Sequence, residues 1–410
     1  MELENDIAGD EVIDLNDPAN MPEERWNEWQ KEHPNSFIHQ VQKGRLGHNK
    51  GMHNGMVAIN NYIYGTHKAR YYLIGADSGV GKTTVSDFMF VLRAWESAKE
   101  QGRNISIFYC SFEISKLAKQ AKWCSYYIFM KHGIELPSEY ILGSIEGKYL
   151  SDDEMRKVKE AYVKIELIMK DIIFLEDAVH PTAIFEGLIS SHYEKVGTVE
   201  RTPVSAEDRK KGKKGFIKGY TPNNPEDICL LVVDHLALVG TEMGLDLKRS
   251  IDKLSRYFVI LRNMFSTTVI AIQQFSTDLL QAKRDKALSA TGAKQSSMIT
   301  PNRLDFGDSK TTYRDADVVI GLVKPADFEL ADFQGYNLAE PKYGGLGGYF
   351  LVMYLMKHRQ GRADKKFAIF INYVAGICYD LPQEIDQMDQ WYEKAEKLDQ
   401  LCLLYSPNND

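Results

Sequence analysis

The chain has 410 residues, 44% hydrophobic and 26% charged, a composition typical of a globular protein large enough for two or three domains. Its 50 basic and 57 acidic residues give a net charge of −7, which excludes a protein that binds polyanions over its whole surface but permits a local basic channel. The five cysteines are scattered without a CxxC pair, and there is no long apolar run, so we expect no zinc ribbon, disulfide scaffold or transmembrane helix.

The N-terminal part divides into a tail and a linker. Residues 1–20 are acidic, contain no lysine or arginine and lack the apolar core of a signal peptide, which predicts a disordered tail on a cytoplasmic protein. Residues 21–55 are predicted to hold a short linker helix at 22–32 and a glycine-containing linker. Trp26 and Trp29 fall on one side of that helix, so it should pack either on the chain's own core or on a neighbouring subunit.

From about residue 56 to residue 380 the pattern predicts one α/β domain. Short apolar runs without alternation are separated by helical stretches, which is typical of a mostly parallel, twisted sheet covered by helices on both faces. The expected strands are Tyr71–Ile74, Ile105–Cys110, Ile172–Leu175, Ile228–Val233, Thr268–Ile272, Val318–Val323, Leu351–Met356 and Phe367–Tyr373. Residues 381–410 form a polar, acidic extension with one helical stretch.

Two polar segments interrupt this domain. Residues 197–226 are basic and rich in glycine and proline; we favour a solvated loop there over an extra contact with DNA or a partner. Residues 275–314 form a second long polar stretch, and stretches of that length are usually functional or disordered. Its basic side chains are candidates for binding DNA: Lys283, Arg284, Lys286, Lys294 and Lys310.

A glycine-rich loop follows the first expected strand and precedes an apolar helix, the context in which a P-loop binds phosphate. Lys82 should reach the β- and γ-phosphates, and the Thr83 hydroxyl should ligate Mg²⁺. The strict pattern begins with glycine, whereas this loop has Ala76 at that position. The nucleotide-binding set is Ala76, Asp77, Ser78, Gly79, Val80, Gly81, Lys82, Thr83 and Thr84.

Two carboxylates complete the expected catalytic site. The run Ile228–Val233 ends in Asp234, which can hold Mg²⁺ at the carboxyl edge of the sheet. The next residue is His235 and not glutamate, so a general base must come from elsewhere. Glu113, just past the second strand, could polarise the attacking water, although a glutamate that only favours a helix start explains the pattern equally well.

Other polar groups at strand ends are weaker candidates by pattern alone. Gln274 could sense the γ-phosphate, with Gln273 as the adjacent competitor, but a lone glutamine is more often a solvated loop residue. Lys357 and Arg359 follow a strand at i and i+2 and should share a face. Arginine often stabilises a transferring phosphoryl group, yet from the pattern alone an ordinary charged strand end is the better explanation of this pair.

Together and in this order, these motifs resemble the DnaB-type hexameric replicative helicases, phage members in particular. GADSGVGKTT resembles the family's Walker A, FYCSFEIS the segment with its catalytic glutamate, and ICLLVVDHLAL its Walker B. IAIQQFS resembles the sensor strand with Gln274 at the glutamine position, DSKTTYRDADVVIGLV the block after the DNA loop, and MKHRQG the segment whose cations reach a neighbour's nucleotide. The likeness covers about residues 40–380.

The resemblance implies a RecA-like P-loop NTPase that uses ATP and Mg²⁺, forms a ring, hexameric as in that family, and moves 5′ to 3′ on single-stranded DNA while it unwinds duplex. It assigns Lys82, Glu113, Gln274, Lys357 and Arg359 to catalysis, Thr83 and Asp234 to the metal, and Lys122 to the nucleotide. It also implies a separate primase or loader as a further partner. The family's DNA-loop arginine and glutamate are replaced by Gly307 and Asp308, so the basic residues named above would substitute.

Three other functions remain open from the sequence. A RecA-like strand-exchange recombinase shares the core and a glutamate after the second strand. A nucleotide-switched assembly or loader ATPase would use the same loop as a switch, and a purely structural protein would bind no nucleotide.

Overall fold

The computed structural model describes residues 49–177, 179–210, 212, 214–276, 298–307, 310–340 and 345–382, with six residues of the segment before them. The chain divides into two compact units, Met1–Gly51 and Met52–Asp410, and the α/β domain belongs to the second. The predicted acidic tail, the Trp26/Trp29 helix, the C-terminal helical stretch and the basic residues from Lys283 to Lys294 lie outside the described residues. Met52 is buried, so residues 52–55, which we assigned to the linker, lie within this second unit.

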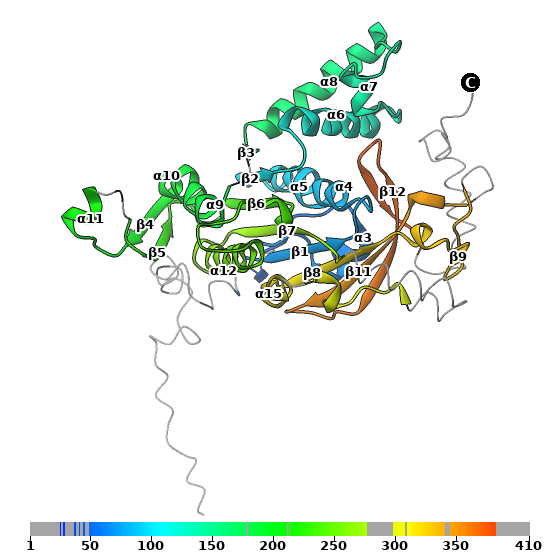
Figure 1. Cartoon of the computed structure of the whole chain (residues 1–410). Helices are drawn as coiled ribbons and strands as arrows, with labels where there is room; N and C mark the ends of the chain where they lie inside the picture. Colours follow the sequence, from blue (N-terminus) through cyan, green and yellow to red (C-terminus); the bar gives the residue numbers. More distant parts are fainter. Residues whose placement is uncertain are drawn as a thin grey trace, which may run out of the picture. The chain divides into compact units, whose positions relative to one another are not determined.

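A nine-stranded sheet organises the unit in the order β13-β12-β11-β8-β1-β7-β6-β2-β3 (Figure 1). The six strands from β8 to β3 in that order are mutually parallel, whereas β11 pairs antiparallel with β8, β12 with β11 and β13 with β12. The fold is therefore the mostly parallel, RecA-like α/β fold that the sequence predicted, extended by an antiparallel edge. The strands of this sheet are β1 Tyr71–Ala76, β2 Ile105–Ser111, β3 Ile172–Leu175, β6 Ile228–Asp234, β7 Thr268–Gln274, β8 Val318–Val323, β11 Phe350–His358, β12 Lys365–Asn372 and β13 Ile377–Asp380.

Helices cover both faces of the sheet, and their ends follow from local sequence signals. Ser115 caps the first turn of α6 by accepting a hydrogen bond from the Ala118 amide, and Gly133 ends that helix in a left-handed conformation. Asp246 caps α12 in the same way. The α-helices are α3 Val57–Ile63, α4 Lys82–Ser86, α5 Arg93–Glu100, α6 Lys116–His132, α7 Ser138–Ile141, α8 Asp152–Met169, α9 Pro181–Leu188, α10 Glu194–Val196, α11 Ala206–Lys210, α12 Leu247–Phe265 and α15 Lys310–Asp315, with π-helical turns η1 Asp87–Leu92 and η2 Ile189–Tyr193.

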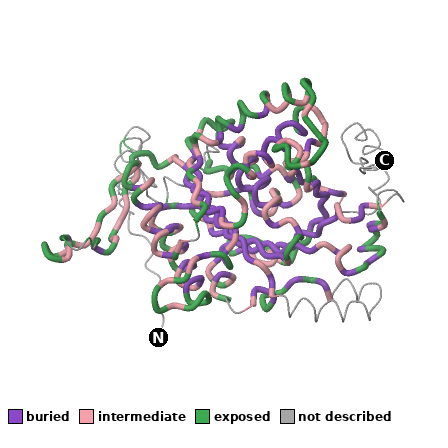
Figure 2. The backbone as a smooth tube through the Cα atoms, turned by 45° about the horizontal axis from the view of Figure 1, so that its top comes forward, coloured by how far each residue is buried: buried purple, intermediate pink, exposed green. Residues whose placement is uncertain are grey.

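The two faces of the sheet bury separate cores. Side chains alternate along β1: Tyr72 and Ile74 join the core under α4, α5 and α6, and Tyr71 and Leu73 join the core under α9 and α12. The strands of this sheet are buried along most of their length, whereas α8 is largely exposed and the hairpin that projects at the left is intermediate to exposed (Figure 2). This burial on both faces explains why the strand sequences are continuously apolar.

The basic segment at 197–226 is not the irregular solvated loop that we expected. Its two ends form an antiparallel hairpin, β4 Gly197–Arg201 with β5 Ile217–Pro222, and α11 lies between them. The hairpin is amphipathic: Val199, Ile217 and Tyr220 pack against the α9/α12 core. Apolar residues on one face therefore stabilise the hairpin. The many charged residues of the segment made its sequence look like that of a solvated loop.

Two further properties concern membrane crossing and the cysteines. No helix within the described part of the chain is both long and apolar enough to cross a membrane. Four cysteines in that part, Cys110, Cys124, Cys229 and Cys378, are free and buried.

Candidate nucleotide site

The glycine-rich loop connects the end of β1 to the start of α4 at the carboxyl edge of the parallel strands. Gly81 has a φ of 106°, and a Cβ there would lie 2.8 Å from the Tyr373 ring and 2.9 Å from Ile371. Both the backbone conformation and the close packing therefore require glycine at this position. The tight turn leaves the first amide groups of α4 at the end of the loop, where a phosphate can accept from them.

Lys82 is held close to this loop. Its ammonium donates to the Asp77 carbonyl at 2.6 Å, and the side chain is 9% exposed. Burial lowers the pKa of Lys82, and Asp77, Glu113 and Asp234 partly offset that effect. The Lys82 side chain thus bends back over the loop. A bound phosphate would be a stronger acceptor for its ammonium than the Asp77 carbonyl that the ammonium now contacts.

The two expected metal ligands contact one another. Thr83 Oγ1 lies 3.1 Å from Asp234 Oδ1 and 3.0 Å from Asp234 Oδ2. Asp234 ends β6 and is 1% exposed, so its carboxylate faces the loop from inside the sheet. A hydroxyl and a carboxylate beside a phosphate-binding loop are the oxygen donors that a nucleotide-bound Mg²⁺ uses, so these residues fit that ion.

Glu113 lies beside the same strand ends. Ser111 pairs with Asp234 across β2 and β6, and the next amide, of Phe112, donates to the Asp234 carbonyl at 3.0 Å. Glu113 is exposed, and its Oε2 lies 3.8 Å from His235 Nε2. Burial lowers the pKa of His235, although Glu113 and Asp234 act in the opposite direction. The contact with His235 was not anticipated from the sequence.

A buried polar network next to Asp234 was also missed by the sequence reasoning. Lys119, on α6, is fully buried and forms ion pairs with Asp87 at 3.0 Å and Asp234 at 3.2 Å. Tyr109 and Trp123 complete it with hydrogen bonds to Asp87 of 2.6 Å and 3.1 Å. Burial alone lowers the pKa of Lys119, but the carboxylates of Asp87 and Asp234 outweigh it and raise that pKa overall. A lysine on the apolar face of a helix, four residues before a tryptophan, was the available sequence signal.

The two glutamines at the end of β7 differ in their surroundings. Gln273 is buried; its amide donates to the Phe306 carbonyl at 2.8 Å, and its carbonyl accepts from the Thr312 hydroxyl at 2.7 Å. Gln274 is half-buried and pairs with Ala76 at the start of the glycine-rich loop. Gln274 is thus next to the loop, as its proposed sensing role requires, whereas Gln273 ties the same strand to α15.

Lys357 and Arg359 lie far from the glycine-rich loop of their own chain. β11 runs antiparallel to β8, so His358 pairs with Val318, the first residue of β8, at the opposite edge of the sheet. The six-residue strand β1 separates the two edges by about 20 Å, at roughly 3.3 Å per residue. The structure therefore does not bring these cations to the glycine-rich loop of the same chain.

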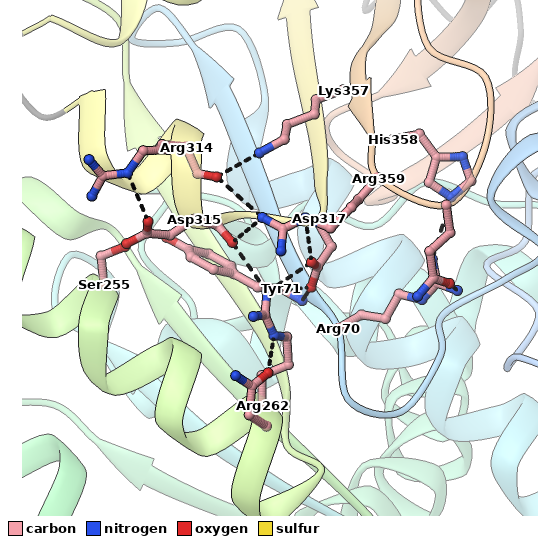
Figure 3. A network of polar contacts seen from close by, with 12 residues as sticks. Arg70, Tyr71, Ser255, Arg262, Arg314, Asp315, Asp317, Lys357, His358 and Arg359 are labelled. Atoms are coloured by element: carbon pink, nitrogen blue, oxygen red, sulfur yellow. Dashed lines mark hydrogen bonds and ion pairs between the residues drawn. The ribbon is translucent and has the colours of Figure 1, made fainter. Parts of the chain in front are cut away.

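At that edge the two cations share one set of partners (Figure 3). Lys357 donates to the carbonyls of Tyr313 at 3.0 Å and Arg314 at 2.7 Å, and Arg359 donates to the Arg314 carbonyl at 3.3 Å. Both side chains thus lie on one face, as their spacing predicts. Arg359 also lies 3.3 Å from Asp317, whose carboxylate is anchored by Arg262 at 2.8 Å.

The remaining predicted positions are only partly within the described residues. Lys122 lines a small pocket together with Thr83, Thr84 and Tyr373. Lys310 is exposed at the start of α15. Gly307 has a φ of 64° and Asp308 lies outside the described residues, as do Lys283, Arg284, Lys286 and Lys294.

Comparison with known proteins identifies the fold. No family model matches the sequence, and a search of curated proteins finds no match. Among solved structures, the ATPase domain of a phage helicase superimposes with a TM-score of 0.58 at 15% identity, over 84% of this chain and 97% of that domain. A DnaB-like replicative helicase, described with its interactions with primase, superimposes with a TM-score of 0.57 at 15% identity, over 84% of this chain and 66% of that one. At 15% identity these two superpositions show the fold alone, and the chain spans about two thirds of the DnaB-like helicase.

Proposed function

We propose that this protein is an ATP-driven DNA helicase that forms a ring, translocates on single-stranded DNA and unwinds duplex. The fold is that of the phage helicase ATPase domain and the DnaB-like helicase, and the glycine-rich loop, Asp234 and Glu113 meet at one edge of its sheet. At 15% identity the likeness speaks for the fold alone, so the support for the activity comes from the site.

One observation supports the assembly of several protomers into a ring. Lys357 and Arg359 lie at the sheet edge opposite the glycine-rich loop, yet they are held together on one face and point the same way. Cations so placed can reach a triphosphate only if it is bound by another protomer. In a closed ring, each protomer supplies its cations to the site of the next, so every site is completed in the same way. This supports a ring over an isolated monomer.

The residues divide the chemistry between them. The glycine-rich loop and Lys82 bind and orient the triphosphate, and Thr83 and Asp234 hold the Mg²⁺ that accompanies it. Mg²⁺ supplies charge neutralisation at the phosphates. Glu113 accepts a hydrogen bond from the attacking water and takes up its proton, and Arg359 of the adjacent protomer stabilises the charge of the transferring group.

Motion would follow from the same site. Gln274 pairs with Ala76 at the start of the loop and directly precedes in sequence the polar stretch that begins at residue 275, so a γ-phosphate contact at Gln274 would be transmitted to that stretch. Its basic residues, with Lys310, would grip single-strand phosphates, so affinity should be independent of sequence and fall with salt. Movement from 5′ to 3′ and a hexamer follow from the family resemblance. The description of the DnaB-like neighbour with primase supports a primase as a further partner.

A forked DNA duplex with one labelled strand tests this proposal. Wild-type protein with ATP and Mg²⁺ should release the strand without any homologous DNA present. Glu113→Gln should bind the nucleotide normally but hydrolyse it at least about 100-fold more slowly, and Lys82→Ala should bind nucleotide poorly.

Other outcomes of this assay identify the alternatives. Strand transfer that needs a homologous partner, without release from the fork, would point to a recombinase. Negligible turnover that DNA does not stimulate, with an oligomer trapped by Glu113→Gln, would point to a nucleotide-switched loader. Equal absence of nucleotide binding in wild type and Lys82→Ala would leave only a structural role.

A further inference from the structure

The buried ammonium of Lys119 occupies the position of a cation site next to the expected metal ligand. It contacts three oxygens from three different elements: Asp87 Oδ2 in η1 at 3.0 Å, Tyr109 OH in β2 at 2.5 Å and Asp234 Oδ2 in β6 at 3.2 Å. A lysine ammonium has three hydrogens to donate, so these three contacts satisfy it fully. The side chain is 0% exposed, which means that the ammonium is a fixed part of the core.

The two oxygens of Asp234 are therefore not equivalent. Oδ2 accepts a hydrogen bond from the Lys119 ammonium at 3.2 Å, and it also lies 3.4 Å from the Tyr109 oxygen, whose single hydrogen is donated to Asp87 Oδ1 at 2.6 Å. The Thr83 hydroxyl lies about equally close to both oxygens, 3.1 Å from Oδ1 and 3.0 Å from Oδ2, so the contact that distinguishes them is the one that Lys119 makes with Oδ2. Because the buried ammonium fixes Oδ2, the carboxylate cannot rotate freely about its last bond, and Oδ1 keeps more of its capacity to accept from or bind a further group.

Charge explains why the chain needs a cation at this place. Asp87 and Asp234 would otherwise be two buried carboxylates that share one neighbourhood, which strongly disfavours the ionised pair. Lys119 neutralises one of the two charges, and Asp87 is held in addition by Tyr109 and Trp123. One net negative charge remains, on the residue that faces the nucleotide.

We propose that Lys119 is a positioning residue for the metal-bearing nucleotide: it clamps Oδ2 of Asp234 and so leaves Oδ1, beside Thr83, for the magnesium that accompanies ATP. This inference rests on the nucleotide site proposed above. It gives Lys119 two separate roles. One is to stabilise the core, and the other is to provide the gain in nucleotide affinity that depends on magnesium.

The test compares affinities for a fluorescent, non-hydrolysable ATP analogue in buffer with Mg²⁺ and in buffer with EDTA. The main variant is Lys119→Met/Asp87→Leu, which removes both members of the ion pair and preserves the net charge of the network. Its affinity in EDTA should stay close to wild type, while its affinity in Mg²⁺ should fall by about 10-fold, the usual cost of losing a group that orients a metal ligand. Its unfolding temperature should fall, because Asp87→Leu removes the acceptor of the Tyr109 and Trp123 hydrogen bonds. Lys253→Met is the control. Lys253 lies on α12 and forms an ion pair with Glu242 at 2.7 Å, so this variant also removes an ion-paired lysine, and it should leave both affinities unchanged.

The outcomes separate the two proposals. If the main variant keeps the full gain in affinity from Mg²⁺, Lys119 only neutralises Asp87 and the inference is overturned. If wild type binds no nucleotide in either buffer, the proposed function fails, and this inference with it. If the main variant does not fold, Lys119→Gln/Asp87→Asn retains polar contacts in the network, and it should show the same selective loss at about 3-fold, within the usual range for one weakened hydrogen bond; an unchanged gain from Mg²⁺ in that variant also overturns the inference.

Discussion

His67 is a residue whose surroundings predict a pH-dependent stability. Burial, with a smaller contribution from Arg70, lowers its pKa to about 4, and its Nε2 has no hydrogen-bond partner among the described residues. An unfolded chain protonates this histidine below its ordinary pKa of about 6.5 whereas the folded chain does not, so stability is lost as the pH falls from about 6.5 towards 4.

We therefore expect the unfolding temperature of wild type to fall over this range more steeply than that of His67→Gln, which cannot titrate. Because the ring is only partly buried, the difference should be at most about 1 kcal/mol per pH unit. Thermal unfolding in a series of buffers measures it, and the two proteins should run parallel between pH 7 and 8. Parallel curves at all pH values would mean that His67 is protonated equally in both states.

At the scale of residues, the sequence predicted groups with a strong pattern and missed those that depend on packing. The glycine-rich loop and Asp234 were found because strand, loop and helix are adjacent in sequence, and the structure brings Thr83 and Asp234 into contact. Lys119 was missed because its carboxylate partners lie 32 and 115 positions away. No local pattern contains such a contact, and a single charged residue on a helix is usually exposed.

At the scale of elements, we expect that the tip of the hairpin β4–β5 can be removed with little change in stability. Its base packs on the α9/α12 core, but Phe216 is 86% exposed and α11 is mostly exposed. Replacing residues 205–213 by three residues of glycine and serine should change stability by no more than about 0.5 kcal/mol, as for other surface changes. Thermal unfolding and salt-dependent binding to single-stranded DNA measure the outcome; a weaker dependence on salt would instead identify the basic tip as a DNA contact.

Elements with one clear period were predicted well, and the exceptions have physical reasons. All eight expected strands are present within one or two residues of their predicted ends, because burial on both faces makes them continuously apolar. The antiparallel pairing of β11 with β8 and with β12 could not be predicted, since buried strands have the same pattern in either direction. β13 is only four residues long and two of them, Tyr379 and Asp380, are not buried, which left no apolar run to recognise.

At the scale of the whole molecule, the antiparallel edge has a consequence for assembly. It turns the end of β11 back to the amino edge of the parallel strands, so the phosphate loop and the cationic pair face opposite ways from one protomer. The sequence alone could supply the pair but not its distance from the loop, because that distance depends on strand direction. In the proposed ring, each protomer would present half of a catalytic site on either side, and the arrangement would close when copies repeat around an axis.

Complementation between two inactive variants tests this arrangement. Lys82→Ala and Arg359→Ala should each lose nucleotide hydrolysis, the second by about 1,000-fold if it acts as a trans-acting arginine. When the two are co-assembled in equal amounts, an Arg359→Ala protomer keeps Lys82 and can face the intact Arg359 of a Lys82→Ala neighbour. Random mixing makes about a quarter of the interfaces complete, so steady-state hydrolysis should reappear at about that fraction. The matched control, Lys82→Ala mixed with Lys82→Ala/Arg359→Ala, has no complete interface and should stay inactive. Full activity of Arg359→Ala alone, or no recovery in verified mixed rings, would contradict a site shared between protomers.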